Sequence, residues 1–256
     1  MDDDKPVLMF GTPVYGGLTP DYVLSLIETR AALRDAGIFS YVEFIRGIAL
    51  VSYARNELAA AFRRSRGTTG PQPNRLLMID ADIGWKKETV FKLLERSKRR
   101  DFVGAAPPHR RFNGKLVAEK ALQGVREPER FGQDYAVRMT DEDRARGKAG
   151  GGDGFIRLAA VGSAFLMLTP SVFDRIQEKA GDSLKYTSPE GHEAHAFFDP
   201  FIRDGQSLGE DGAFCQRWKD AGGDIELLVD APMTHEGPVR VAGNLADLMY
   251  EGSGSR

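Results

Sequence analysis

The regular alternation of short apolar runs with amphipathic segments in residues 6–105 constrains the fold of this chain most strongly. Runs rich in β-branched and aromatic residues predict strands, and apolar residues at helical spacing predict helices. The strands expected on this basis are 6–10, 39–45, 75–79 and 101–105, and the helices between them are 20–36, 53–64 and 87–97. Because a helix joins each pair of strands, the order predicts an α/β fold, a Rossmann-like, mostly parallel sheet with helices on both faces.

The second half of the chain has a weaker pattern. Residues 107–154 are polar and rich in glycine, which indicates a flexible, irregular excursion. Beyond it we expect a strand at 157–168, a helix that opens at Thr169-Pro170, an irregular stretch at 181–206, a helix at about 210–221 and a last strand at 225–229. The tail, residues 244–256, is expected to hold a short helix and a disordered end.

Composition narrows the class of protein. The chain of 256 residues has a net charge of −2, which gives no global attraction to nucleic acid. Cys215 is the only cysteine, so no internal disulfide is possible. No run approaches the roughly 18 apolar residues of a membrane span, and the acidic start is unlike a signal peptide. These features favour a cytoplasmic protein without a transmembrane segment.

Two acids end the third predicted strand. After Arg75 this strand is continuously apolar, as in a strand buried on both faces, and Asp80 and Asp82 follow it. If strand geometry continues, both side chains project to the same side. Two like charges there are costly unless a cation lies between them, and carboxylate oxygens suit Mg²⁺ or Mn²⁺. We therefore predict a metal site, with two capping acids at a turn as the simpler alternative.

Three further motifs lie near predicted strand or helix ends. Arg55 and Asn56 are expected to open a helix, where free backbone N–H groups and a guanidinium favour a diphosphate. Glu210 and Asp211 begin another helix, either as ordinary N-terminal acids or as a general base. His235 follows the strand at 225–229 and would complete a mixed oxygen and nitrogen metal site with the two aspartates.

The other histidines carry no comparable pattern. His192 and His195 flank Glu193, but no second acid or thiol lies at ligand spacing in the sequence, so zinc is not predicted there.

In this order, the motifs resemble the GT-A glycosyltransferases, especially their family 2-like branch. Ala-Arg-Asn at 54–56 followed by the Asp-x-Asp strand looks like the nucleotide-binding half of these enzymes. The segment 162–173 looks like their central strand and helix, and the segment 210–235 looks like their C-terminal signature. The resemblance spans about residues 6 to 240.

The resemblance implies a single GT-A domain over 1–243, followed by the tail 244–256. Residues 1–106 would be the nucleotide-sugar-binding half, and 107–243 the acceptor-binding half with its irregular region. It further implies an enzyme that uses Mn²⁺ or Mg²⁺ to transfer a sugar from a nucleoside-diphosphate sugar, with a UDP-sugar favoured. The acceptor would be a hydroxyl of a glycan or another surface polymer.

The family's site residues transfer to this sequence as expectations. Thr12, Pro13 and Tyr15 would line the nucleoside pocket, and Arg55 would approach the phosphates. Asp80 would contact the metal or the ribose, and Asp82 and His235 would bind the metal. Asp211 would act as the base, with support from Glu210.

Two other functions stay open. Compact phage GT-A enzymes that glycosylate hydroxymethyl-pyrimidines in DNA resemble this layout, and basic clusters at 63–66, 98–100 and 110–111 would then track phosphates. A non-catalytic module that only binds a nucleotide-sugar donor is the second alternative, and a small-molecule acceptor is also open. A dinucleotide-binding Gly-x-Gly-x-x-Gly and a phosphate-binding P-loop motif are both absent from the sequence.

Overall fold

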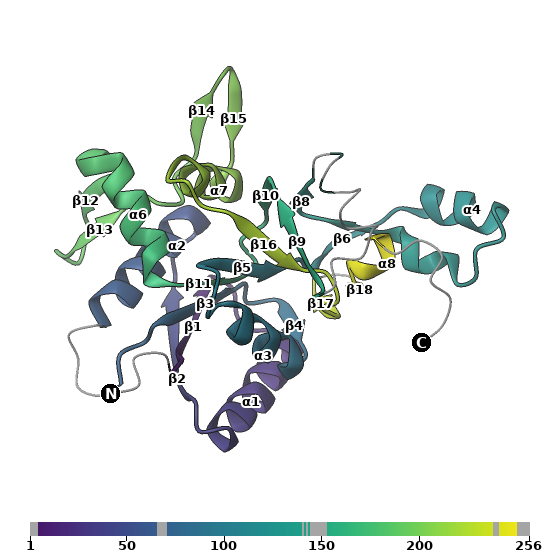
Figure 1. The fold of residues 1–256 in the computed structure, drawn as a ribbon, viewed down its shortest axis with the longest axis horizontal. Helices are drawn as coiled ribbons and strands as arrows, with labels where there is room; N and C mark the ends of the chain where they lie inside the picture. Colours follow the sequence, from purple (N-terminus) through teal and green to yellow (C-terminus); the bar gives the residue numbers. More distant parts are fainter. Residues whose placement is uncertain are drawn as a thin grey trace.

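The centre of the molecule is a seven-stranded sheet in the order β2-β1-β3-β11-β5-β16-β9 (Figure 1). The structure is a computed structural model that describes residues 5–65, 71–139, 141, 143, 153–237 and 241–249. The strands of the sheet are β1 (Val7–Val14), β2 (Phe39–Arg46), β3 (Arg75–Ile79), β5 (Phe102–Ala105), β9 (Phe155–Leu158), β11 (Phe165–Leu168) and β16 (Ile225–Leu228). β1 is parallel to β2 and β3, and β16 is parallel to β5, whereas β11 and β9 are antiparallel to their neighbours.

Helices cover both faces of this sheet, which confirms the predicted α/β class and mostly parallel sheet. One face packs against α1 (Pro20–Asp35) and α3 (Lys87–Arg96), and the other against α2 (Val51–Arg64), α6 (Pro170–Ala180) and α7 (Glu210–Asp220) (Figure 1). Successive side chains of a strand point to opposite faces. In β3, Leu77 and Ile79 enter the first core and Leu76 and Met78 the second, so the strand is apolar after Arg75.

Shorter elements surround the sheet. The strand groups are β6 (Pro108–Phe112) with β7 (Gln133–Tyr135), β8 (Val137–Arg138) with β10 (Ala160–Val161), β12 (Lys185–Thr187) with β13 (Glu193–His195), β14 (Phe201–Arg203) with β15 (Gln206–Leu208), and β4 (Ile83–Trp85) with β17 (Met233–His235) and β18 (Val241–Gly243). The remaining helices are α4 (Gly114–Leu122), α8 (Ala246–Met249) and the 3-10 turns η2 (Pro128–Gly132) and η3 (Gly181–Leu184). None of the helices in the described ranges combines the length and the apolar character needed to cross a lipid bilayer.

Elements of the first half lie close to their predicted positions. The side chain of Thr19 accepts a hydrogen bond from the Tyr22 amide and caps α1, and Pro20 occupies the first turn. Helix α2, however, begins at Val51 with Leu50 as its N-cap residue, two residues before the predicted start. This shift matters for the site, because it moves Arg55 and Asn56 away from the helix N-terminus.

The second half departs from prediction at several points. The segment predicted as one strand at 157–168 is divided among three strands, β9, β10 and β11, because the chain bends at Ala159 and turns at Ser163 and Ala164. The stretch predicted as irregular at 181–206 contains two hairpins. Part of the polar excursion is ordered as β6, α4 and β7, and α4 buries none of its residues.

Two predicted segments are only partly described. The glycine-rich run beginning at Gly147 lies largely outside the described residues, as do Arg66 and residues 250–256. The short helix predicted in the tail is present as α8.

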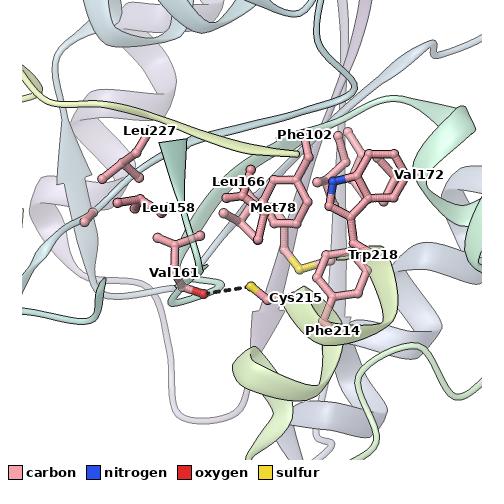
Figure 2. Close-up of a cluster of buried hydrophobic side chains, with 14 of the residues drawn as sticks. Met78, Phe102, Leu158, Val161, Leu166, Val172, Phe214, Cys215, Trp218 and Leu227 are labelled. Carbon is pink, nitrogen blue, oxygen red and sulfur yellow. Dashed lines mark hydrogen bonds between the residues drawn. The ribbon is translucent and has the colours of Figure 1, made fainter. Parts of the chain in front are cut away.

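Helix α7 is anchored by an aromatic cluster on one face of the sheet. The Phe214 ring stacks on Phe198 with 4.1 Å between ring centroids and tilts against Phe102 at 5.6 Å. Beside it, the Cys215 thiol is buried and donates a hydrogen bond to the Val161 carbonyl over 3.4 Å, as Figure 2 shows. Burial raises the pKa of the Cys215 thiol to about 12.

We predict that this thiol is inert in the folded protein, because the thiolate is the reactive form. Native protein treated with Ellman's reagent at pH 8 should react on the order of 10³-fold more slowly than protein in guanidinium chloride. Equal rates in the two conditions would show that the thiol is exposed.

Candidate functional site

A buried guanidinium joins the end of β3 to the start of α7. Arg55 is only 3% exposed, and its Nη2 donates to both oxygens of Asp80 over 2.9 and 3.1 Å. Its Nη1 donates to Glu210 and to Asp211, both over 3.2 Å. Burial alone would lower the pKa of Arg55, but the charges of Asp80 and Asp211 outweigh burial and raise it. The guanidinium therefore stays charged and orders three carboxylates.

This arrangement corrects the role predicted for Arg55. The residue lies in the second turn of α2, where helical hydrogen bonds already use the backbone N–H groups. Three acids occupy its Nη atoms, so the guanidinium is not exposed to clamp a diphosphate. Asn56 is equally occupied, since its amide oxygen accepts from the Phe198 backbone over 2.8 Å and its nitrogen donates to Asp199 over 2.7 Å.

The Asp82 carboxylate and the His235 imidazole meet beside this cluster. His235 belongs to β17, a strand that sequence reasoning missed, and it pairs with Ile83 of β4. Its Nε2 lies 3.3 Å from Asp82 Oδ2, and its Nδ1 lies 2.8 Å from the Pro108 carbonyl. Because a carbonyl only accepts, Nδ1 carries a proton, and Nε2 faces the Asp82 carboxylate, to which a protonated imidazole donates when no ion lies between them.

Close packing at Gly84 makes this pairing possible. Gly84 lies opposite Thr234 in the β4–β17 ladder, and a Cβ on Gly84 would collide with the Thr234 hydroxyl and with Asp21. The Glu236 amide then donates to the Asp82 carbonyl over 2.8 Å. These contacts hold Asp82 and His235 together although they are far apart in the sequence.

The charges of the site do not balance. Arg110 reaches Asp82 over 3.1 Å, so two guanidinium groups, Arg55 and Arg110, face the four carboxylates Asp80, Asp82, Glu210 and Asp211. Burial alone would raise the pKa of Asp82, but the hydrogen bond and charge of His235, together with Arg110, lower it. Asp82 is therefore ionised, and because the carboxylates outnumber the positive groups even when His235 is protonated, the site favours a further cation.

The predicted metal ligands converge only in part. An aspartate oxygen and an imidazole nitrogen whose second nitrogen is pinned by a carbonyl form a chemically suitable pair for Mn²⁺ or Mg²⁺. Asp80 does not join them, because both of its oxygens bond Arg55. Among the described residues, the ligand atoms of Asp80, Asp82 and His235 do not all come within 4.8 Å of one another. Asp82 and His235 are thus suitable ligands for an ion, whereas Asp80 bonds Arg55 instead.

Asp211 is held in a fixed orientation at the start of α7. Its Oδ1 accepts from Arg55 and also from the backbone N–H of Ser163 over 2.9 Å. Gly162 allows this approach, since a Cβ there would lie 2.9 Å from the Ala136 side chain. Sequence reasoning missed Ser163, because a backbone donor leaves no residue-type signal. A carboxylate fixed through one oxygen can accept a proton on the other.

The residues predicted to line a nucleoside pocket separate into two groups. Thr12 is fully buried and its hydroxyl lies 2.6 Å from the Tyr22 hydroxyl, so its side chain has no surface to offer a ligand. Pro13 is half-buried near the end of β1, and Tyr15 is 73% exposed in the loop that follows. Of the three, Tyr15 has the ring available for stacking.

Comparisons with known proteins assign no family to this chain. It matches no model of a known protein family, and no curated protein is significantly similar to it.

We predict that Arg55→Met, which keeps a long side chain but removes the charge, destabilises the fold strongly. Without the guanidinium, three carboxylates face one another in a partly buried site. Since these acids are 28–37% exposed and water screens them, we expect a loss of about 2 kcal/mol in the free energy of unfolding, measured in urea.

The matched control is Arg34→Met, which removes a 78% exposed guanidinium paired with Asp35. It should change stability by less than about 0.5 kcal/mol. Equal effects of the two substitutions would contradict the role given to Arg55.

Proposed function

We propose that this protein is a metal-dependent glycosyltransferase that moves a sugar from a nucleoside-diphosphate donor to an acceptor hydroxyl. The observation that carries the proposal is the convergence of Asp82 and His235 beside a fixed Asp211, near the end of the buried strand β3. In α/β sheets, ligands bind outside the carboxyl ends of the strands. An ion ligand pair and an oriented carboxylate at that edge are the parts that sugar transfer requires.

Asp82 and His235 would hold the Mn²⁺ or Mg²⁺ ion. When bound, the ion supplies positive charge for the leaving diphosphate. The excess of carboxylates over arginines at the site supports this assignment, because the donor's phosphates would otherwise meet a net negative charge. Arg110, half-exposed and 3.1 Å from Asp82, is placed to add a second positive group.

Asp211 would act as the base. A proton must leave the acceptor hydroxyl as its oxygen bonds the sugar, and a nearby carboxylate can take it. Its contacts with Arg55 and Ser163 restrict the carboxylate to one orientation, so little ordering is required during the reaction. Glu210 shares the Arg55 guanidinium and would support this arrangement or contact the acceptor.

The charge distribution gives no support to a DNA acceptor. Arg63 contacts Asp174 and Gln177, Arg100 contacts Glu226, and Arg110 contacts Asp82. Each of the predicted basic clusters thus has an arginine already paired with an acid, which reduces the charge left for phosphates. A glycan or another surface polymer remains the proposed acceptor, and a UDP-sugar the proposed donor.

Asp82→Asn should uncouple nucleotide binding from metal. For the unmodified protein, UDP with Mn²⁺ at about 100 times its Kd should raise Tm by about 5 °C, and UDP with EDTA should not. The variant should lose the metal-dependent increase in Tm, because an amide is a poor ligand for a hard cation. Differential scanning fluorimetry measures both.

Asp35→Asn, at an exposed site, is the control and should respond to UDP and Mn²⁺ as the unmodified protein does. A full metal-dependent shift in Asp82→Asn would remove Asp82 from the ion site.

Asp211→Asn should reduce transfer by about 10²-fold or more and leave UDP binding within about threefold, because the amide keeps an acceptor oxygen but cannot take the proton. UDP release from UDP-sugars, measured with a panel of acceptor glycans, follows transfer. Undiminished release by the variant would exclude Asp211 as the base. Donor binding without any acceptor-stimulated release in the unmodified protein would favour the non-catalytic module.

A further inference from the structure

A second group of potential metal ligands lies away from Asp82 and His235. One ligand atom each of Glu57, Glu190 and His192 falls within 4.8 Å of the other two. Glu57 comes from the middle of α2, whereas Glu190 and His192 come from the connection between β12 and β13. The sequence analysis found no second acid or thiol at ligand spacing and did not predict zinc at His192, whereas the structure places Glu57 from a remote helix and Glu190 from the same turn near this imidazole.

Glu57 is the buried member of this group. Its side chain is 7% exposed, and its Oε2 lies 2.8 Å from His192 Nε2. Within the described chain, its only ion-pair contact is with this imidazole, which is uncharged unless protonated. Burial and the nearby charges of Glu57 and Glu190 raise the pKa of the Tyr53 hydroxyl, which reflects the negative potential around the group. A buried carboxylate in such a field is stabilised by a cation.

Both potential ligands are oriented by a second set of groups. The Ser188 hydroxyl is buried and lies 3.0 Å from His192 Nδ1, which directs Nε2 toward Glu57. The Tyr186 hydroxyl donates to Glu57 Oε1 over 3.0 Å, which leaves Oε2 to face the imidazole. In metal sites, ligating imidazoles and carboxylates are commonly held by hydrogen bonds of this kind.

A tight turn supplies the third potential ligand. The Gly191 amide donates to the Ser188 carbonyl over 2.9 Å, and Gly191 has a φ of +82°, a conformation that favours glycine. Pro189 precedes Glu190 in this turn, and proline is favoured at that position. The turn thus places the exposed Glu190 carboxylate two residues from His192.

We propose that Glu57, Glu190 and His192 bind a divalent transition-metal ion, with Zn²⁺ as the best match, and that this ion fastens the β12–β13 hairpin to α2. One imidazole nitrogen and two carboxylate oxygens form a three-ligand set that leaves a fourth position for water. Ligands about 2.1 Å from a tetrahedral zinc ion are roughly 3.4 Å apart. The His192 and Glu57 atoms need to separate by only a fraction of an ångström to admit it.

The position of the ion gives it a structural role. Three consecutive residues of α2 each contact a different segment. Arg55 bonds Asp80 at the end of β3, and Asn56 bonds Asp199. Glu57 contacts His192 of the β12–β13 hairpin. An ion on Glu57 would therefore fix α2 against the second half of the chain, two residues from Arg55, which orders the candidate active site.

Zinc titration of the Asp82→Asn protein tests this proposal without the other ion site and independently of sugar transfer. Calorimetry should show one Zn²⁺ bound per chain in the Asp82→Asn protein. Adding Glu190→Gln to this protein should weaken zinc binding at least about 10-fold. Adding Ser188→Ala instead, which removes the hydrogen bond to the imidazole, should weaken zinc binding by about 10- to 100-fold. Since Glu190 is exposed, its replacement should not affect folding, which circular dichroism verifies.

Glu193→Gln is the matched control on the same hairpin. Its carboxylate bonds Lys185 over 2.6 Å and is not a member of the ligand group, so zinc affinity should be unchanged. Anomalous scattering at the zinc edge should place one ion between Glu57, Glu190 and His192. Equal affinities of Glu190→Gln and Glu193→Gln, or no stoichiometric zinc binding by the Asp82→Asn protein, would overturn the proposal.

Discussion

The buried guanidinium of Arg55 is the interaction on which the candidate site depends. A charge that is 97% removed from water is tolerated only with compensating partners, and here three carboxylates provide them. Asp80 directly follows β3, and Glu210 and Asp211 begin α7. The hydrogen bonds of Arg55 to these acids therefore also fix how the two halves of the chain pack together. The proposed base, Asp211, obtains its orientation from this contact and from the Ser163 amide.

Pairing of β4 with β17 is the second requirement of the site. It places His235 beside Asp82, and the Pro108 carbonyl keeps a proton on Nδ1 of the imidazole. The same principle operates at the hairpin, where Ser188 orients His192 toward Glu57. In both places the proposed metal ligands include one acid and one histidine from distant segments, and the histidine is held by a hydrogen bond that would not involve the ion.

Much of the first half was predictable because its signals are local. Continuous apolar runs mark β3 and its neighbours, and Thr19 with Pro20 marks the start of α1. Shorter strands were missed in the second half, since two or three residues give no periodic pattern. Helix α4 was missed because it lies within the polar, glycine-rich segment 107–154, whose composition indicated an irregular excursion.

The sequence by itself determined an α/β chain with acids at the end of β3 and at the start of α7, because strand burial and helix ends follow from residue type and order. Only the tertiary structure decided which charges meet. In the folded chain, Arg55 bonds Asp80 and the acids of α7, and His235 contacts Asp82. Glu57 contacts His192. Distances between side chains on separate elements depend on strand pairing and helix packing, which residue spacing along the chain does not record.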